Sequence, residues 1–355
     1  MIPFDHFFAA AWRHCLGLAL LLTMSLPTWG QFDRALAFDA GGSSNDYVDL
    51  VLGNAMAGRT EFTVEFWMRA EASAQNSGRS AFYAVRNNGV DIFIIYMGGA
   101  NPVMANSGTI AIRVAGNVVV SNSLVGDGRC HHIAYVYTEA QGTPSNHLYI
   151  DGVLDVSYSD AVTFISSDNH DLGTDVNSFN YTGLLDEFRL WTVARTQAEI
   201  QANMYRTVSA PDPDLLVYYR FDQGNPGANN VGLTTLIDHS GNALDGTLQG
   251  FDLDSTVSNW VDPNYPTISV GLDSAECARE INQVTLSGNG LNGPLSYLLN
   301  GSAAPGFQFN LGAGTHQLWI EDALGCPSRD TTLTLTDPTP ITFDTDSQRL
   351  SCDTL

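Results

Sequence analysis

Basic side chains are scarce in this chain. Its 355 residues include 15 Lys and Arg, all of them arginine, against 38 Asp and Glu. The formal net charge of −23 repels nucleic acid and anionic lipid, which excludes both as main partners. The acidity suits an exported protein that meets divalent cations, and solubility alone is the alternative explanation.

Long apolar runs are absent after residue 30, so no membrane insertion is expected once the N-terminus is removed. At the N-terminus, Arg13 precedes the apolar run Leu16–Leu26, and Gly30 offers a small residue before a cut at Gln31. The run is shorter than the about 20 residues of a spanning helix. Residues 1–30 are therefore predicted to be a signal peptide, and the mature protein is predicted to be secreted or at the cell surface.

Helical patterns are rare, and strand patterns are frequent. From Phe62 to Arg69 apolar and other residues alternate, as in a half-buried strand. The pairs Gly116-Asn117 and Asp151-Gly152 each predict a two-residue hairpin, and Asn88-Gly89 marks a third turn. Turns at intervals of about 8–12 residues are typical of an all-β sandwich or jelly roll.

The segment Gly183–Ile200 departs from this pattern, because a predicted helix follows a predicted strand in it. Its first half is a predicted strand, with Leu184, Phe188 and Leu190 on one face. Strand alternation places the adjacent Asp186 and Glu187 on opposite faces. Thr196-Gln197-Ala198-Glu199 then forms a capping box, which predicts a short helix from Gln197 to about Tyr205.

Several segments carry a family resemblance. They are ALAFDAGGSSNDYVDL (Ala35–Leu50), FTVEFWMRA (Phe62–Ala70), CHHIAYVYT (Cys130–Thr138), LYIDGVL (Leu148–Leu154), Gly183–Ile200 and Leu215–Gly250. Together they resemble the laminin-G-like jelly-roll family, related to the pentraxins and legume-type lectins. The resemblance implies an all-β jelly-roll sandwich with one short helix over residues 31–265. The family usually carries tryptophan at the position of Cys130.

The same resemblance implies a calcium ion at one rim of the sandwich. The matching ligands are Asp186, with Asp39 and the Asn45-Asp46 turn from the opening strands. Calcium favours several oxygen ligands, which carboxylates and amides supply. The alternative is structural: Asp186 caps a turn, and Glu187 pairs with Arg189 or another strand.

Residues 266–340 are predicted to form a second, smaller β-sandwich. Ile341–Cys352 echoes Thr267–Cys277, so residues 341–355 are interpreted as the start of a truncated second repeat. The pattern is similar to the Ig-like repeats of surface adhesins from gliding bacteria. Four cysteines remain after signal removal and allow three pairings. The repeat favours a Cys277–Cys326 disulfide and leaves Cys130 as a buried lone thiol.

Catalytic patterns find little support. Neither Glu61/Glu65 nor Asp186/Glu187 reproduces the facing carboxylates of a glycosidase, and no GxSxG motif is present. We therefore expect a non-enzymatic recognition or adhesion protein that binds a glycan or an extracellular protein. The alternatives are a targeting module of a larger secreted hydrolase and a structural stalk with no ligand. Four aromatics could stack on sugar rings or be buried in the core: Tyr47, Phe179, Tyr181 and Trp260.

Overall fold

The computed structural model describes most of the chain. The described residues are 34–39, 45–71, 73, 75, 79–98, 108–114, 116–166, 168–175, 179–208, 211–256, 258–273, 282–290, 292–328 and 331–336. The predicted signal peptide (residues 1–30), Cys277 and the predicted second repeat (residues 341–355) lie outside them. In this described part, no helix is long and apolar enough to cross a membrane.

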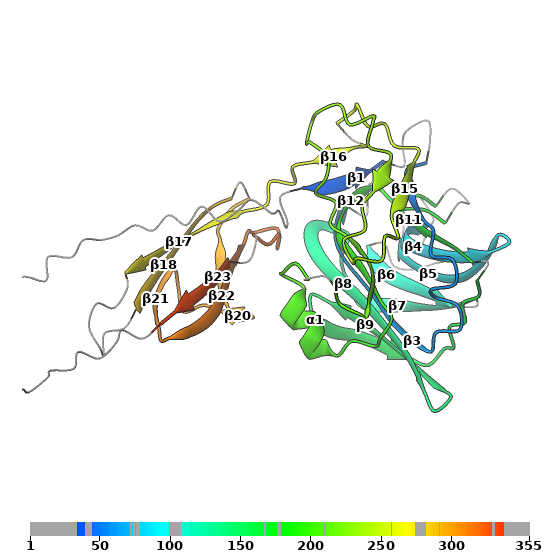
Figure 1. Ribbon diagram of the computed structural model, residues 1–355, viewed down its shortest axis with the longest axis horizontal. Coiled ribbons are helices and arrows are strands. Elements are labelled where there is room, and N and C mark those ends of the chain that lie inside the picture. Colours follow the sequence, from blue (N-terminus) through cyan, green and yellow to red (C-terminus); the bar gives the residue numbers. More distant parts are fainter. Residues whose placement is uncertain are drawn as a thin grey trace, which may run out of the picture.

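Two eight-stranded antiparallel sheets pack together as a first sandwich in the described residues (Figure 1). Sheet A has the order β10-β9-β8-β3-β12-β1-β16, with β13 beside β12. Its strands are β1 (Ala35–Phe38), β3 (Glu61–Glu71), β8 (Asp127–Ala140), β9 (Thr143–Ile150), β10 (Val153–Tyr158), β12 (Gly183–Trp191), β13 (Leu215–Tyr219) and β16 (Trp260–Val261).

Sheet B has the order β14-β15-β2-β11-β4-β5-β6-β7. Its strands are β2 (Tyr47–Leu50), β4 (Arg79–Asn87), β5 (Val90–Gly98), β6 (Thr109–Val114), β7 (Asn117–Leu124), β11 (Asn169–Leu172), β14 (Thr235–Leu236) and β15 (Gly246–Gln249). The three predicted hairpins are present, and β4–β5 and β9–β10 pair around the expected turns. In β6–β7 the pairing of Val114 with Asn117 sets the turn one residue earlier than the predicted Gly116-Asn117. Asp151 and Gly152 adopt φ of 52° and 72°, as a two-residue hairpin of the primed type requires.

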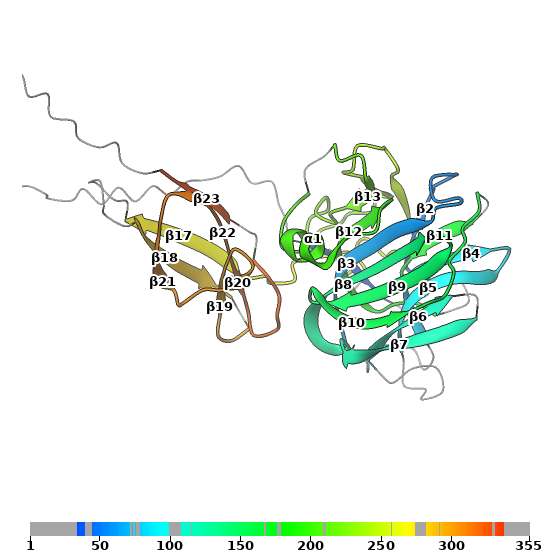
Figure 2. The same cartoon turned by 90° about the horizontal axis from the view of Figure 1, so that it is seen from below.

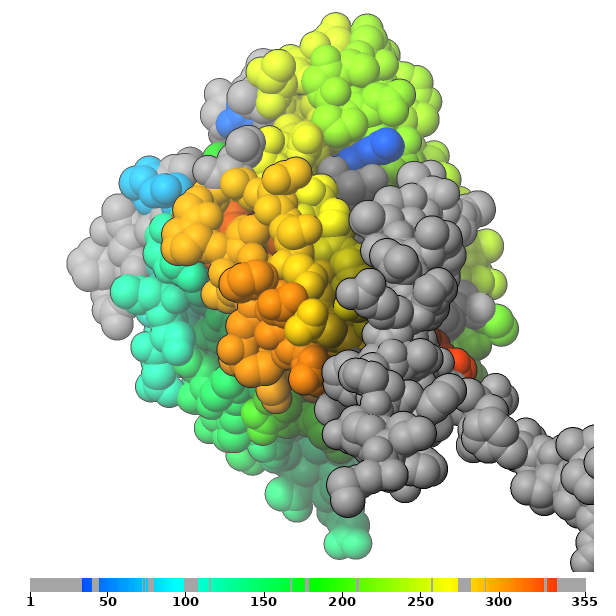
Figure 3. Space-filling view, turned by 90° about the vertical axis from the view of Figure 1, so that its left-hand side faces the viewer, coloured from blue at the N-terminus to red at the C-terminus, as the bar shows by residue number. Residues whose placement is uncertain are grey.

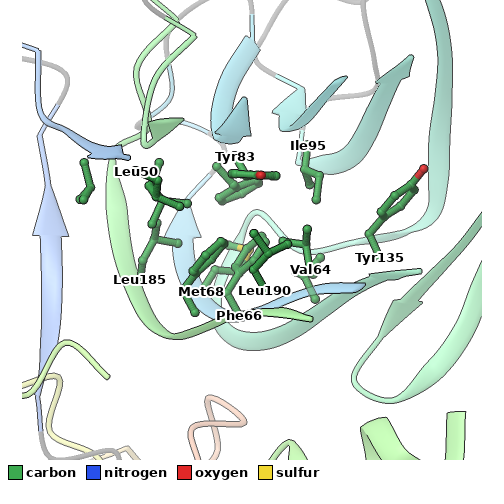
Figure 4. Close-up of a cluster of buried hydrophobic side chains, with 14 of the residues drawn as sticks. Leu50, Val64, Phe66, Met68, Tyr83, Ile95, Tyr135, Leu185 and Leu190 are labelled. Carbon is green, nitrogen blue, oxygen red and sulfur yellow. The ribbon is translucent and has the colours of Figure 1, made fainter. Parts of the chain in front are cut away.

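The apolar faces of the two sheets share one core (Figure 4). In it, Val64 and Phe66 of β3 and Leu190 of β12 lie with Tyr83 and Ile95 of sheet B. Burial of this shared face is the main favourable contribution to folding, since each large apolar side chain contributes about 1.5–3 kcal/mol. The predicted all-β sandwich is confirmed.

The outer face of sheet A is also covered, so β3 is buried on both faces rather than half-buried. Its Glu65 and Trp67 are 0 % and 3 % exposed. One cover is the helix α1 (Gln197–Asn203) with the turn that follows it, since the Trp67 indole Nε1 donates to the Met204 carbonyl at 2.7 Å. The predicted capping box is confirmed, with both reciprocal bonds present between Thr196 and Glu199.

A β-bulge in β12 overturns the expected alternation of that strand. The register against β3 shifts between Asp186 and Arg189, and Glu187 takes a φ of 52°. Leu185 and Phe188 therefore face the core, and both intervening carboxylates lie on the outer side of sheet A. The prediction that Asp186 and Glu187 point to opposite faces is wrong, and Leu185 takes the core position expected for Leu184.

A second sandwich follows, formed by a three-stranded and a four-stranded sheet in the described residues (Figure 2). The first contains β17 (Thr267–Asp273), β18 (Asn282–Asn289) and β21 (Gln308–Leu311). The second contains β19 (Ser296–Leu299), β20 (Ser302–Ala303), β22 (Gly314–Glu321) and β23 (Thr331–Leu335). Its small core is formed by Val284, Leu286, Phe309, Leu311, Leu318 and Leu335.

A disulfide joins the two sandwiches. Cys130 of β8 bonds Cys326, which follows 196 residues later. Beside it, the Cys130 backbone N–H donates to the Leu324 carbonyl at 2.8 Å, and Arg129 Nη1 donates to the Ala323 carbonyl at 2.6 Å. When the molecule is viewed from the side of the second sandwich, this sandwich lies in front of sheet A (Figure 3). The predicted Cys277–Cys326 pairing is wrong, as is the lone thiol at Cys130.

Candidate functional site

Three of the four predicted calcium ligands lie at one rim of the first sandwich. Asp39 follows β1, and Asn45 and Asp46 precede β2. The Asp39 backbone N–H donates to Asp46 Oδ2 at 2.8 Å. Asn45 Oδ1 accepts a bond from the Asn180 amide at 2.6 Å. The first bond joins the end of β1 to the start of β2, and the second joins the start of β2 to the segment before β12.

The loop after β15 completes this rim. Gly250 lies so close to Asn45 that a Cβ atom there would be 2.0 Å from the Asn45 carbonyl oxygen. Its φ of +79° also favours glycine. Beyond it, residues 250–254 line a cavity of about 240 Å³ together with Val231, Thr234 and Leu248. We call Asp39, Asn45, Asp46 and the 250–254 loop the rim site.

Carboxylates dominate the electrostatics of the rim site. Burial raises the pKa of Asp46 to about 6, and the negative charges of Asp39 and Asp252 also raise it. Hydrogen bonds from Asp39 and Ser258 lower this pKa but do not outweigh burial. A hydrogen bond with Asp254 raises the pKa of Asp252. Carboxylates that repel one another in this way favour a bound cation, which offsets the repulsion.

The fourth predicted ligand, Asp186, lies elsewhere. The pairing of β1 with β12 sets Phe38 opposite Gly183 and Leu36 opposite Leu185. Asp186 is therefore separated from Asp39 by about 10–13 Å of strand at ~3.3 Å per residue. Its side chain is buried against Tyr265 and Glu187, and burial is the main reason that its pKa lies well above the ordinary value. This position agrees with the structural alternative rather than with a shared calcium site.

No group of three or more His, Cys, Asp and Glu residues able to hold a metal ion occurs among the described residues. The donor chemistry of the rim site still fits calcium, since Asp39 and Asp46 supply carboxylate oxygens and Asn45 an amide oxygen. Calcium binding remains a prediction.

The outer face of sheet B carries a carboxylate pair that the sequence analysis missed. Asp49 of β2 and Asp171 of β11 are register partners. Their neighbours Leu50 and Leu172 face the core, so the two carboxylates share the outer face. Arg86 Nη2 lies 3.5 Å from Asp171 Oδ2, and both side chains are buried. Burial raises the pKa of Asp171 to about 6 despite this cation.

Replacing Asp171 by asparagine is expected to flatten the pH dependence of stability between about pH 4 and 6. The pKa of Asp171 in the folded state, about 6, exceeds the ordinary value of 3.8. The folded protein therefore gains stability from the protonated carboxyl group below pH 4, and this stability is lost as the pH rises to 6. The wild type should lose up to about 3 kcal/mol relative to Asp171→Asn across this window. Urea unfolding at pH 4, 5, 6 and 7 measures the difference; parallel curves for the two proteins would contradict it.

The other candidates from the sequence are structural. Tyr181 and Trp260 are fully buried in the core of the first sandwich, which excludes both from stacking on a ligand. Glu65 is buried too, accepts the Trp191 indole N–H at 2.8 Å and lies 3.5 Å from Arg189. It cannot reach a solvent-borne substrate.

Comparisons with known proteins agree with this architecture. Residues 41–201 match the family model of the Concanavalin A-like lectin/glucanases superfamily. Among curated protein sequences, none matches this chain. A candidate carbohydrate binding protein from Bacteroides ovatus is similar in structure, with a TM-score of 0.50 and 19% identity, over 62% of this chain and 59% of that one. The match thus spans less than two thirds of that protein.

Two further solved structures align with less of the chain. The heptameric SAP-like pentraxin from Limulus polyphemus has a TM-score of 0.39 and 12% identity, over 48% of this chain and 81% of that one. The CBM40 of the Ruminococcus gnavus IT-sialidase has a TM-score of 0.35 and 13% identity, over 48% and 97%. The family match and the two packed sheets identify a concanavalin A-like jelly-roll fold in the first sandwich.

Proposed function

We propose that this chain is a secreted or cell-surface recognition protein that binds glycans at the rim site, with calcium held by Asp39, Asn45 and Asp46. The observation that carries the proposal is the proximity of these residues: the Asp39 backbone N–H bonds Asp46 Oδ2, and Gly250, which lies against Asn45, begins the loop that lines a cavity of about 240 Å³. A cation there would neutralise the buried Asp46 carboxylate and present open coordination positions to sugar hydroxyls.

The family match supports the same assignment, because the superfamily includes lectins. The disulfide suits an oxidising, extracytoplasmic environment. The second sandwich would project the binding rim from a surface, which is the arrangement that adhesion requires. No enzymatic step is part of the proposal.

Calcium is expected to raise the melting temperature of the wild-type protein, and EDTA to reverse the rise. At a calcium concentration 100 times Kd the stabilisation is about 2.7 kcal/mol. Asp46→Asn should abolish the shift while keeping the bond from the Asp39 N–H, because an amide oxygen can accept it. Asp273→Asn, an exposed substitution in the second sandwich, is the matched control and should respond to calcium as the wild type does.

A glycan array run in calcium and in EDTA completes the test. Binding that requires calcium and is lost in Asp46→Asn supports the rim site. An unchanged melting midpoint, together with an array silent in both buffers, would exclude calcium-dependent glycan recognition.

A further inference from the structure

A groove lies at the junction of the two sandwiches. Its cavity of about 430 Å³ falls within the ~300–1,000 Å³ of small-molecule sites. One wall is α1 with the turn after it, including Tyr205 and Arg206, and the other is formed by Asn300–Ser302 and by Gln317 and Trp319 of β22. Figures 1 and 2 both show α1 facing the β19–β20 hairpin.

Both walls are held by hydrogen bonds. Arg189 donates to the Asn203 and Arg206 carbonyls at 3.0 and 2.7 Å, which holds the turn after α1 on sheet A. Across the groove, the Asn300 side chain accepts the Gln317 backbone N–H at 2.8 Å. The Arg206 guanidinium donates to the Gln317 side chain and so connects the walls. A ligand would therefore meet a preorganised surface, which lowers the entropic cost of binding.

The lining is rich in uncharged hydrogen-bonding groups beside a stacked pair of aromatic rings. The rings of Tyr205 and Trp319 are stacked, with centroids 4.7 Å apart. Amide side chains of Gln201 and Gln317 and the Ser302 hydroxyl lie in the same groove. Amide and hydroxyl side chains beside a guanidinium suit the hydroxyl groups and the carboxylate of an acidic sugar.

The charge of the groove differs from that of the whole chain. The chain has 38 Asp and Glu, yet among the described residues none lines the groove, and Arg206 is the only charged side chain of that lining. Glu321 contacts the Tyr205 hydroxyl from behind, and burial raises the pKa of this carboxyl group, which favours its neutral form. An anionic ligand would therefore meet a guanidinium and no lining carboxylate.

We infer that the junction groove is a second binding site, for an oligosaccharide that carries a carboxylate. The inference rests on the proposed glycan recognition. It assigns acidic oligosaccharides to a site around Arg206 that is separate from the rim site. The carboxylate pairs with the guanidinium, and the hydroxyl groups of a pyranose ring bond the amide side chains of the groove. Calcium is not required, because the groove offers no carboxylate ligands to the metal.

The test is a titration of the full, disulfide-intact chain in EDTA, followed by calorimetry and tryptophan fluorescence. Digalacturonate and 3′-sialyllactose are the two acidic probes, and they distinguish a uronic acid from a sialic acid. Lactose is the neutral comparison. Arg206→Gln should weaken binding of the preferred acidic probe at least 10-fold, and Ser302→Trp, at an exposed hairpin position, should block it by filling the groove.

The control variants are Arg59→Gln and Ser287→Trp, which make the same changes at exposed positions outside the groove. Both should bind like the wild type. If the acidic probes bind Arg206→Gln and Ser302→Trp with wild-type affinity, the groove is not their binding site. The rim-site proposal is unaffected by that result. Absence of binding by either acidic probe in EDTA has the same meaning.

Discussion

Replacement of Arg189 by methionine is expected to lower the free energy of unfolding by about 3–5 kcal/mol, because it leaves buried carboxylates without their cation. Arg189 is 1 % exposed; its Nη2 lies 2.6 Å from Glu187 Oε2 and its Nη1 3.5 Å from Glu65 Oε1. Burial alone would lower its pKa, but Tyr218, Glu187 and Glu65 outweigh burial and raise it. The guanidinium is therefore charged throughout the pH range of a folded protein.

The loss of stability caused by Arg189→Met should be smaller at low pH than at high pH. Without the guanidinium, the pKa of Glu187, already raised by burial, should rise further. The neutral acid then becomes the favoured folded form, so the loss should be smaller at pH 5 than at pH 8. Urea unfolding at both values measures it.

Arg113→Met is the matched control. Arg113 lies 3.5 Å from Asp91, but its side chain is 29 % exposed. A partly exposed ion pair contributes about 0–1 kcal/mol, so this substitution should have a small effect. Equal losses for the two variants would show that the buried position of Arg189 does not determine its contribution.

Removal of the disulfide through Cys130→Ala and Cys326→Ala is expected to uncouple the two sandwiches. In the chain-entropy account, closing a loop of this length contributes about 5 kcal/mol. Without it, the remaining junction contacts are a few hydrogen bonds and the Tyr205–Trp319 stack. The double variant avoids leaving one reactive thiol.

Calorimetry checks this expectation. One cooperative transition in the wild type should become two in the double variant, with the second sandwich melting first because its core is smaller. Peptide mapping without reduction should recover Cys130 linked to Cys326. A single transition at the wild-type temperature would show that the docked arrangement does not depend on the bond.

Local features of the fold could be predicted from the sequence. The capping box at Thr196 and the hairpin turns at Asn88-Gly89 and Asp151-Gly152 depend on residues within a few positions of one another, and all are present. The bulge in β12 could not be found in this way. It arises where β12 pairs with β3, and the period-2 rule assumes that no residue is inserted.

The candidate site could be predicted only in part, because its geometry depends on contacts between residues far apart in the sequence. All four predicted calcium ligands come from the resemblance. Asp39 and Asp46 lie seven residues apart and are joined by a hydrogen bond, whereas Asp186 lies farther along β12. The cysteine pairing failed for a related reason. The repeat suggested a bond within one module, but Cys326 lies in a loop that packs on β8, and no sequence period encodes that contact.

The bond between Cys130 and Cys326 has a consequence for the order of synthesis. The first sandwich is complete in the nascent chain well before Cys326 is translated, since β16 ends at Val261. Cys130 must therefore remain reduced while its partner is still missing. Any fragment that ends between Val261 and Cys326 would carry an unpaired thiol on the outer face of sheet A, open to mixed disulfides with other thiols.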